Sequence, residues 1–317
     1  MIESYRLENS DLSAIIVPPE GGRIASLRSM ESGVEFLTQS ERSGAYVQTG
    51  LDTPFLDGPC AGVEECLPTV ARCGPDTPGG AVPDHGDFWQ LAWQVISSSD
   101  SDIEIEAKGF SRPLMFSKRI SLDGSELCID YRVQNLAPED TSFLYACHPL
   151  FAVSPGDRIV LPPEVRSLSL DYSRHERLGR RGAEISWPRS QSGLELDVVD
   201  APTSGIAEML YTSSLKEGWC GIYRSAERQG VKITFDTRQL GYLGIWLCYG
   251  GWPDDSAKPR QYAVALEPAT APCNGLAGAI DRGMAMTLGG GKDFSWNLRF
   301  QVSKSDALFS DFCHGAG

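Results

Sequence analysis

The sequence has 317 residues, of which 41% are hydrophobic, enough to build a substantial core. Its 28 basic and 42 acidic side chains give a formal net charge of −14. Nucleic acids and anionic membrane surfaces bind basic proteins, so this balance argues against both as partners. A neutral small molecule, or one recognised by a few local side chains, fits the charge better.

Alternation of apolar and polar residues runs through most of the chain and predicts β-strands. A short apolar run at residues 12–17 ends at Pro18, and glycines at 21–22 lead into the next strand. Clean period-two patterns follow at residues 101–108, 116–122, 127–133, 231–235 and 294–302. Asp123-Gly124, between two of these segments, is a hairpin turn signal. This period indicates strands with one face buried and the other in water.

Helical patterns are sparse, and the clearest candidate is a short helix within residues 202–216. The 33 glycines and 20 prolines are spread along the chain, as in many short strands joined by turns. We therefore expect an all-β fold of stacked antiparallel sheets, with residues 1–317 in a single domain. The expected irregular parts are a long loop at about residues 51–93 and a flexible tail after Ser303.

Nine cysteines, an odd number, cannot all pair with one another, and none of their spacings is C-x-x-C. Cys60, Cys66 and Cys73 precede His85, but their spacing matches no standard zinc pattern. We expect no metal site and no cofactor. Reduced thiols, an N-terminus without an apolar signal core and no membrane-spanning run favour a cytoplasmic protein.

The loop at residues 51–93 is too long for a plain connection, and such loops often carry function. It contains Arg72 and the stretch Pro83-Asp84-His85-Gly86-Asp87-Phe88-Trp89. A histidine between an acid and a glycine, beside aromatic residues, suits the lip of a pocket. The alternative is a turn in which His85 only bonds to the backbone.

His148 lies in an apolar stretch, residues 142–153, and is followed at once by Pro149. Proline interrupts strand pairing and extends the residue before it, so we expect His148 at a strand end with a fixed direction. A buried histidine satisfied by the core is the alternative.

Two later strands carry further candidates. Residues 242–252 are dense in aromatic side chains, among which Trp246 could stack on a sugar ring or simply belong to the core. Glu267 interrupts an apolar strand and is followed by Pro268. A carboxylate in such a place costs free energy unless it is paired or functional.

Three of these motifs, taken in order, resemble the aldose 1-epimerase (galactose mutarotase-like) superfamily. They are Asp84-His85-Gly86, Ala146-Cys147-His148-Pro149 and Leu266-Glu267-Pro268, and the glycine-led strand at residues 21–27 adds to them. The resemblance would cover about residues 10–303. Asp84 stands where the best-known galactose mutarotases have asparagine, and the run after His148 also differs, so the chain resembles a divergent branch.

The resemblance implies a large antiparallel β-supersandwich with an open cleft, and a protein that interconverts the α and β anomers of a monosaccharide. It also implies that His148 acts as the acid toward the ring oxygen and Glu267 as the base toward the anomeric hydroxyl. His85 would bind the sugar. Arg72, thirteen positions earlier, and Trp246 are the further substrate-binding candidates.

Two other functions stay open at this point. A lyase or hydrolase could use a histidine and a carboxylate on a glycosidic bond or a uronate, although a hydrolase would want a second carboxylate near Glu267. A non-catalytic sugar-binding module would need only the cleft. The chain is expected to be a monomer or a homodimer.

Overall fold

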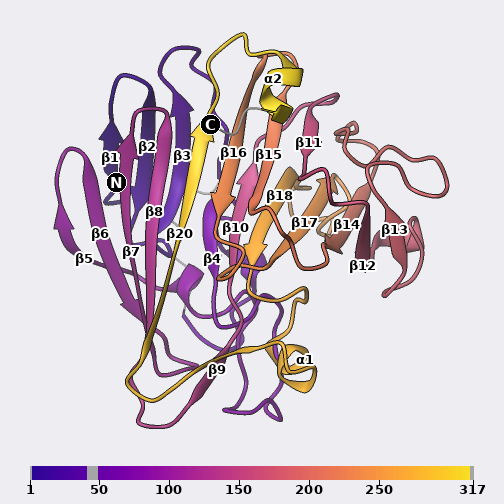
Figure 1. The fold of residues 1–317 in the computed structure, drawn as a ribbon. Helices are drawn as coiled ribbons and strands as arrows, with labels where there is room; N and C mark the ends of the chain where they lie inside the picture. The colour runs from indigo at the N-terminus through magenta and orange to yellow at the C-terminus, as the bar shows by residue number, and fades with distance from the viewer. Residues whose placement is uncertain (1, 41–48, 315–317) are drawn as a thin grey trace.

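The computed structural model describes residues 2–40 and 49–314. Within these ranges the chain forms two large antiparallel sheets that face each other, one small sheet and a few short helices (Figure 1). Most of the long connections, together with the first α-helix, gather at the lower end of the molecule in Figure 1. Neither α-helix of the described chain is long and apolar enough to cross a membrane.

The larger sheet has ten strands, whose central members position the candidate site. In spatial order they are β1 (Tyr5–Glu8), β2 (Leu12–Val17), β3 (Arg23–Ser29), β4 (Gly62–Cys66), β10 (Ala146–Phe151), β18 (Tyr262–Ala269), β17 (Tyr242–Tyr249), β14 (Ile206–Tyr211), β12 (Ser167–Ser173) and β13 (Glu184–Ser186).

The second sheet has eight strands. In spatial order they are β11 (Arg158–Val160), β15 (Trp219–Arg224), β16 (Gln229–Phe235), β20 (Asp293–Val302), β8 (Glu126–Asn135), β7 (Leu114–Asp123), β6 (Asp102–Lys108) and β5 (Gln94–Ser98). The remaining described elements are a two-stranded sheet of β9 (Thr141–Phe143) and β19 (Met286–Leu288), the helices α1 (Leu276–Asp281) and α2 (Phe309–His314), and 3-10 turns at Phe55–Asp57, Phe88–Gln90 and Arg174–Glu176.

The expectation of an all-β antiparallel fold is confirmed. Every period-two segment noted in the sequence is a strand, namely β6, β7, β8, β16 and β20. All five belong to the eight-stranded sheet, and burial alternates along β6, β7, β8 and β20, whereas β16 is buried along most of its length. β7 and β8 pair through the hairpin at Gly124, whose φ is +52°. These strands alternate because one of their faces packs on the other sheet and the other face meets water.

The core between the two sheets contains a buried ion pair as well as apolar side chains. Lys118 of β7 lies 2.7 Å from a carboxylate oxygen of Glu65 of β4, and both side chains are fully buried. The hydroxyls of Tyr131 and Tyr145 donate to the same carboxylate at 3.1 and 2.9 Å. Trp296 stacks on Tyr131 with ring centres 5.2 Å apart. The two sheets are therefore joined by a polar network enclosed in aromatic rings.

Two sequence expectations about local structure are wrong. Residues 202–216 hold the strand β14 rather than a helix, because its apolar run is buried on both faces between β12 and β17 and so lacks a period of two. The long loop expected at residues 51–93 is interrupted by β4, a fully buried strand that contains two glutamates. The flexibility expected of the tail after Ser303 stays a prediction; the described part of this tail contains the helix α2, whose Phe312 is buried against Tyr223.

His148 also lies differently from expectation, within β10 and not at a strand end. β10 pairs with β4 without a break from Ala146 to Leu150. On its other side, the pairing with β18 is interrupted between those two residues. Pro149, which has no backbone N–H to donate, falls in this interruption. The proline therefore acts on one neighbouring strand only, and β10 continues past it.

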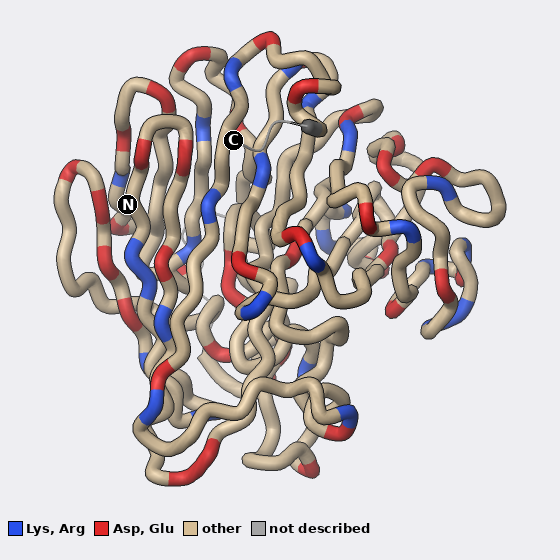
Figure 2. The backbone as a smooth tube through the Cα atoms, viewed as in Figure 1, with Lys and Arg blue, Asp and Glu red and all other residues tan. Residues whose placement is uncertain are grey.

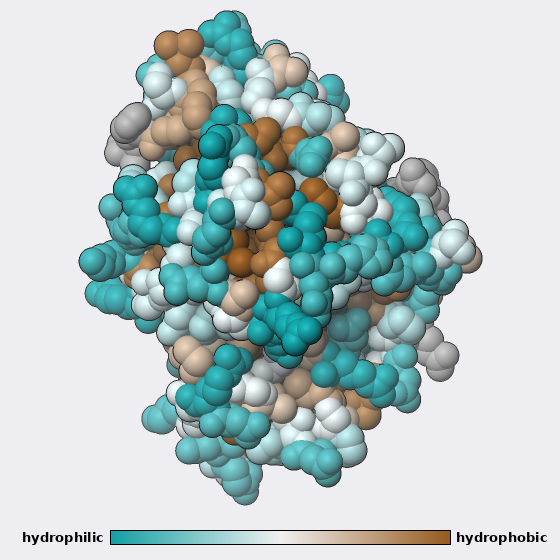
Figure 3. All heavy atoms as spheres, turned by 90° about the vertical axis from the view of Figure 1, so that its right-hand side faces the viewer, coloured by the Kyte–Doolittle hydropathy of each residue, from teal (hydrophilic) through white to brown (hydrophobic). Residues whose placement is uncertain are grey.

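Charged residues of both signs are interspersed along the surface strands and loops, as Figure 2 shows. Seen from the side of the molecule that is on the right of Figure 1, apolar atoms are visible between hydrophilic groups at the centre of the face (Figure 3). Apolar surface thus reaches the outside near the edge of the sandwich that carries β11–β13.

Candidate active site

Three neighbouring strands in the middle of the ten-stranded sheet carry titratable side chains in one row. Glu64 of β4 is directly opposite His148 of β10. On the other side, the pairs Ala146–Ala269 and Leu150–Ala265 place Glu267 of β18 opposite His148. Directly opposite residues project from the same face of a sheet. The three side chains therefore stand together on one face.

Strand alternation puts this row on the face that points away from the eight-stranded sheet. The residues next to the row, Glu65, Cys147 and Leu266, face the core between the sheets, where all three are buried. Their neighbours must point the opposite way, toward the loops that cover the outer face. The strands thus fix the direction of His148 and Glu267 without help from any loop.

His148 lies between two carboxyl groups and is itself buried, with a side chain 7% exposed. Its Nε2 is 3.8 Å from Oε1 of Glu267, and its Nδ1 is 3.9 Å from Oε2 of Glu64. Both distances exceed a direct hydrogen bond. A hydroxyl oxygen can bond to Nε2 and Oε1 together by sitting beside the line that joins them, about 2.8 Å from each.

Burial sets the protonation of this row. It lowers the pKa of His148 to about 3, with a smaller contribution from His85 and an opposing one from Asp84. Burial also raises the pKa of Glu267 to about 8. At neutral pH the imidazole is therefore neutral and the carboxyl group of Glu267 is protonated. In the free protein Glu267 is thus the proton donor of the pair and His148 the acceptor, and Glu267 can serve as a base only if a bound ligand favours its ionised form.

His85 approaches His148 from the loop side. Its ring stacks on Phe55 with centres 3.6 Å apart and meets the ring of His148 edge-on at 5.4 Å. His85 has a φ of +58° and Gly86 one of +76°. A Cβ atom on Gly86 would lie 2.0 Å from the carbonyl oxygen of Leu67, so only glycine fits there. The turn predicted from the motif thus brings His85 into the site.

Asp84 fixes the imidazole of His85 from the side. Its Oδ1 is 3.1 Å from Nδ1 of His85. Burial acts to raise the pKa of Asp84, but bonds to His85 and to backbone N–H groups lower it below its usual value. An ionised Asp84 accepts a hydrogen bond from Nδ1–H, which leaves the far nitrogen of the ring to face a ligand.

These side chains line a cleft of about 530 Å³. Trp246 of β17 forms part of its wall, with its Nε1 donating to Oε1 of Gln261 at 2.7 Å. Trp252 meets the Trp246 ring edge-on at 6.2 Å. The residues lining the cleft are Phe55, Val70, Ala71, Asp84, His85, His148, Asp171, Tyr172, Arg181, Met209, Trp246, Trp252, Asp254, Gln261, Glu267 and Asn274.

Asp171 was not found from the sequence, and a strand irregularity explains why. The pairing of β12 with β14 shifts between Leu170 and Tyr172, which leaves Asp171 outside the ladder, as in a β-bulge. One oxygen of Asp171 accepts two bonds from Arg181, at 3.0 and 2.6 Å, and the other accepts from Nδ2 of Asn274 at 2.6 Å. A bulge leaves no mark in hydrophobic periodicity.

Of the five site residues expected from the sequence, four line the cleft and Arg72 does not. The guanidinium group of Arg72 is 57% exposed and bonds to Asp52. Its neighbours Val70 and Ala71 do reach the cleft. The positive group of the cleft is Arg181 instead, which comes from the segment between β12 and β13.

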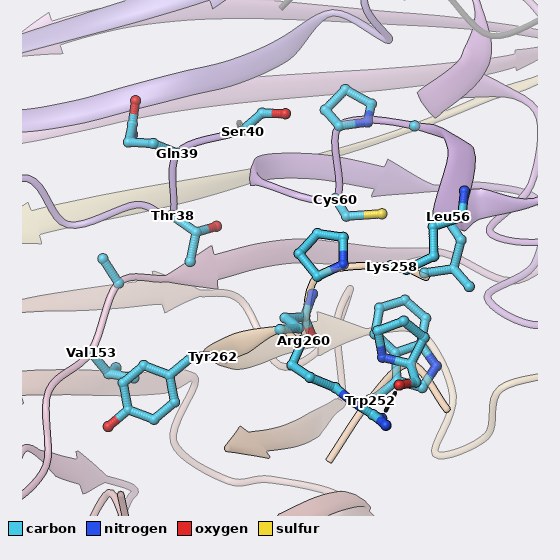
Figure 4. A pocket seen from close by; sticks show the side chains of 16 residues that line it. Thr38, Gln39, Ser40, Leu56, Cys60, Val153, Trp252, Lys258, Arg260 and Tyr262 are labelled. Atoms are coloured by element: carbon cyan, nitrogen blue, oxygen red, sulfur yellow. Dashed lines mark hydrogen bonds between the residues drawn. The ribbon is translucent and has the colours of Figure 1, made fainter. Parts of the chain in front are cut away.

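A second cavity of about 350 Å³ adjoins the cleft and shares Trp252 and Gln261 with it (Figure 4). Lys258 on its wall bonds to Asp57 at 2.7 Å, and Arg260 donates to the backbone carbonyl of Pro253. No aspartate or glutamate is among the described residues that line this cavity, whereas Asp84, Asp171, Asp254 and Glu267 line the cleft.

Comparison with known protein families agrees with the geometry of the site. The family model for aldose 1-epimerase matches residues 3–172, more than half of the chain. The chain belongs to the aldose 1-epimerase family. The matched part of this family member includes His85 and His148, while Glu267 and Trp246 lie beyond it. Comparison with curated proteins gave no significant match.

Solved structures show that the whole family fold is present. The Slr1438 protein of Synechocystis sp. PCC 6803 superposes with a TM-score of 0.71 at 18% identity, covering 96% of each chain. A galactose mutarotase-like protein from Clostridium acetobutylicum gives 0.68 at 16% identity, covering 94% of each chain. One from Lactobacillus casei ATCC 334 gives 0.67 at 15%, covering 95% of this chain and all of the other. At these identities the likeness concerns the fold.

Among the described residues of this family member, no group of three or more His, Cys, Asp or Glu side chains is arranged to hold a metal ion.

Proposed function

We propose that this protein is an aldose 1-epimerase that interconverts the α and β anomers of a free aldose. The observation that carries the proposal is the pair His148 and Glu267, two buried groups 3.8 Å apart that line one cleft. Anomer exchange requires that the ring oxygen gain a proton while the anomeric hydroxyl loses one. A buried acid and a buried base beside one sugar meet this need.

The ring opens in one exchange of protons. Glu267 releases its proton to solvent as the sugar binds, because hydrogen bonds from sugar hydroxyls to a carboxylate favour its charged form. Glu267 then removes the proton of the anomeric hydroxyl, the C1–O5 bond breaks, and Nε2 of His148 gives its proton to O5. The resulting aldehyde rotates about the C1–C2 bond. Reversal of the same steps closes the ring on the other face.

The remaining cleft residues hold the sugar. Trp246 and the stacked pair of His85 and Phe55 offer ring faces to the C–H edges of a pyranose. His85 supplies a polar nitrogen, since Asp84 occupies the other one. Asp171, Asn274 and Arg181 form a bonded group suited to sugar hydroxyls.

The test is anomer exchange measured by saturation-transfer NMR over a panel of neutral, phosphorylated and acidic aldoses. We expect the protein to accelerate exchange for at least one of them, and His148→Asn to abolish the acceleration. Broadening of sugar resonances without faster exchange for the whole panel would mean a sugar-binding module. Cleavage of a glycosidic bond would place the protein in another enzyme class.

Gly244 offers a way to move the proposed base without changing it. Gly244 of β17 is opposite Glu267, and a Cβ atom there would lie 3.3 Å from the Cβ of Glu267 and 2.9 Å from Cε of Met209. We expect Gly244→Ala to push Glu267 aside and to lower the exchange rate by up to about a hundredfold, as a misplacement of about 1 Å can do.

The matched control for this variant is Gly74→Ala, whose Cβ would meet nothing within 4 Å. It should leave the exchange rate unchanged. Both variants should keep circular dichroism spectra like that of the parent. An exchange rate for Gly244→Ala within twofold of the parent would contradict the tight packing around Glu267.

A further inference from the structure

Glu64 is a buried titratable group that the proposed reaction does not yet use. Its side chain is 2% exposed, and neither carboxyl oxygen has a hydrogen-bond partner among the described residues. Nδ1 of His148, 3.9 Å away, has none either. Buried polar groups without partners are rare in proteins, and such a pair calls for a functional explanation.

The position of Glu64 is behind His148 as seen from the cleft. His148 and Glu267 line the cleft, whereas Glu64 does not. The pairing of Ile24 with Val63 continues the row beyond Glu64 to Arg23 of β3, which is also buried and is bonded to Glu20 at 2.6 Å. A sugar therefore reaches His148 without touching Glu64, so that Glu64 can act only through the imidazole.

The reaction also leaves a question about the proton of His148. A neutral imidazole that gives up its Nε2 proton must receive another at Nδ1, because the doubly deprotonated ring is not accessible near neutral pH. Glu64 is the group that faces Nδ1, and Asp84 is engaged with His85.

We propose that Glu64 is a positioning residue that acts through His148, holding its proton on Nε2 and replacing that proton at Nδ1 as the ring opens. This rests on the function proposed above. Before the step, Glu64 is protonated and donates to Nδ1, Nε2 carries the ring proton, and Glu267 is ionised. The proton of Glu64 passes to Nδ1, that of Nε2 passes to O5, and the proton of the anomeric hydroxyl passes to Glu267. One negative charge moves from Glu267 to Glu64, and His148 stays neutral throughout.

The groups around the row support a protonated Glu64 at neutral pH. Burial raises the pKa of Glu64 to about 8, Arg23 acts against this rise and Glu20 adds to it. From the other elements, Glu267 faces His148 on β18, and His85 and Asp84 face it from the loop. At 3.9 Å the carboxyl group of Glu64 still faces Nδ1 and can set the tautomer of the ring, and catalytic hydrogen bonds are often long in free proteins.

The test reads the imidazole directly, with no sugar present. Nitrogen-15 shifts of selectively labelled histidine distinguish a protonated Nε2 from a protonated Nδ1, and the chain has only four histidines, so His148→Asn assigns the signal. The shifts are read in Glu267→Gln, because the carboxyl group of Glu267 faces Nε2 and its pKa is also raised to about 8; there we expect the Nε2–H form below about pH 8. Above it, an ionised Glu64 accepts from Nδ1–H, and the proton of the ring moves to Nδ1.

Two isosteric variants identify the group responsible. We call this pH-dependent move of the ring proton the tautomer switch. Glu64→Gln, added to Glu267→Gln, should remove the switch and hold the Nε2–H form at every pH, because an amide does not change its charge with pH. Glu267→Gln should keep the switch. A switch that survives in Glu64→Gln overturns the proposal. So does a Glu267→Gln protein in which Nδ1 carries the proton at pH 6, a result that requires no substitution at Glu64.

Anomer exchange gives the functional consequence. Glu64→Gln should slow exchange by roughly 10- to 100-fold, as is typical where the outer partner of a metal-bound histidine is removed, with little change in KM. Unchanged exchange in a folded Glu64→Gln protein would overturn the proposal. If the switch behaves as expected but no aldose is epimerised, the arrangement of Glu64 stands and the proposed function fails.

Discussion

Glu267→Gln is expected to slow anomer exchange by about a hundred- to ten-thousandfold, the usual effect of removing one general base. The amide keeps the shape of the side chain and can still bond to a sugar hydroxyl, so sugar affinity should change far less. Exchange by saturation-transfer NMR and affinity by titration, measured on one sample, separate the two effects. A folded variant that exchanges anomers at the parent rate would end the assignment of Glu267 as the base.

The same variant should not be less stable than the parent. Because the pKa of Glu267 is raised by burial to about 8, the folded protein binds more protons than the unfolded chain between about pH 4.5 and 8. Its contribution to the free energy of unfolding therefore falls as pH rises through this window. Glutamine removes that fall, so the stability of the variant relative to the parent should increase from pH 5 to pH 8. Urea denaturation at both pH values measures this.

Lys118→Met should destabilise the fold by about 3–5 kcal/mol, the cost of leaving one charge of a buried pair without its partner. The carboxylate of Glu65 would remain between the two sheets with only the hydroxyls of Tyr131 and Tyr145 as donors. Denaturant unfolding followed by tryptophan fluorescence gives the loss. Exchange per folded molecule should persist, because Glu65 points to the opposite face of β4 from Glu64.

The double variant Glu65→Gln/Lys118→Met serves as the control. It removes both charges and keeps an amide oxygen for the two tyrosines, so it should recover most of the lost stability. If the free energy of unfolding of Lys118→Met is within 1 kcal/mol of the parent value, the pair does not hold the sheets together, whatever the stability of the double variant.

The two sheets differed in how readily the sequence predicted them. Four strands of the eight-stranded sheet, β6, β7, β8 and β20, have one face in water, and all four were predicted from the sequence. β4, β14 and β18 are buried on both faces, so their residues carry no period. This is why β14 was expected to be a helix and β4 part of a loop.

Site residues that stand in a short local motif could be predicted from the sequence. Those brought to the site by the pairing of strands could not. His85, His148 and Glu267 stand next to glycine or proline, which mark them in the sequence. Asp171 is exposed to the cleft by a register shift in β12, and the sequence pointed to Arg72 where the cleft contains Arg181. The role inferred for Glu64 depends on strand register, which no single segment contains.

The row on β4, β10 and β18 separates two tasks along the chain. The groups that would exchange protons are anchored in strands paired on both sides, whereas His85, Trp252 and Asn274 lie on connections between strands. Connections accept substitution and insertion more readily than central strands do. Mutations in the connections alone can therefore change which sugar is preferred. The residues that would exchange protons lie on the strands, so the reaction itself would stay the same for each new substrate.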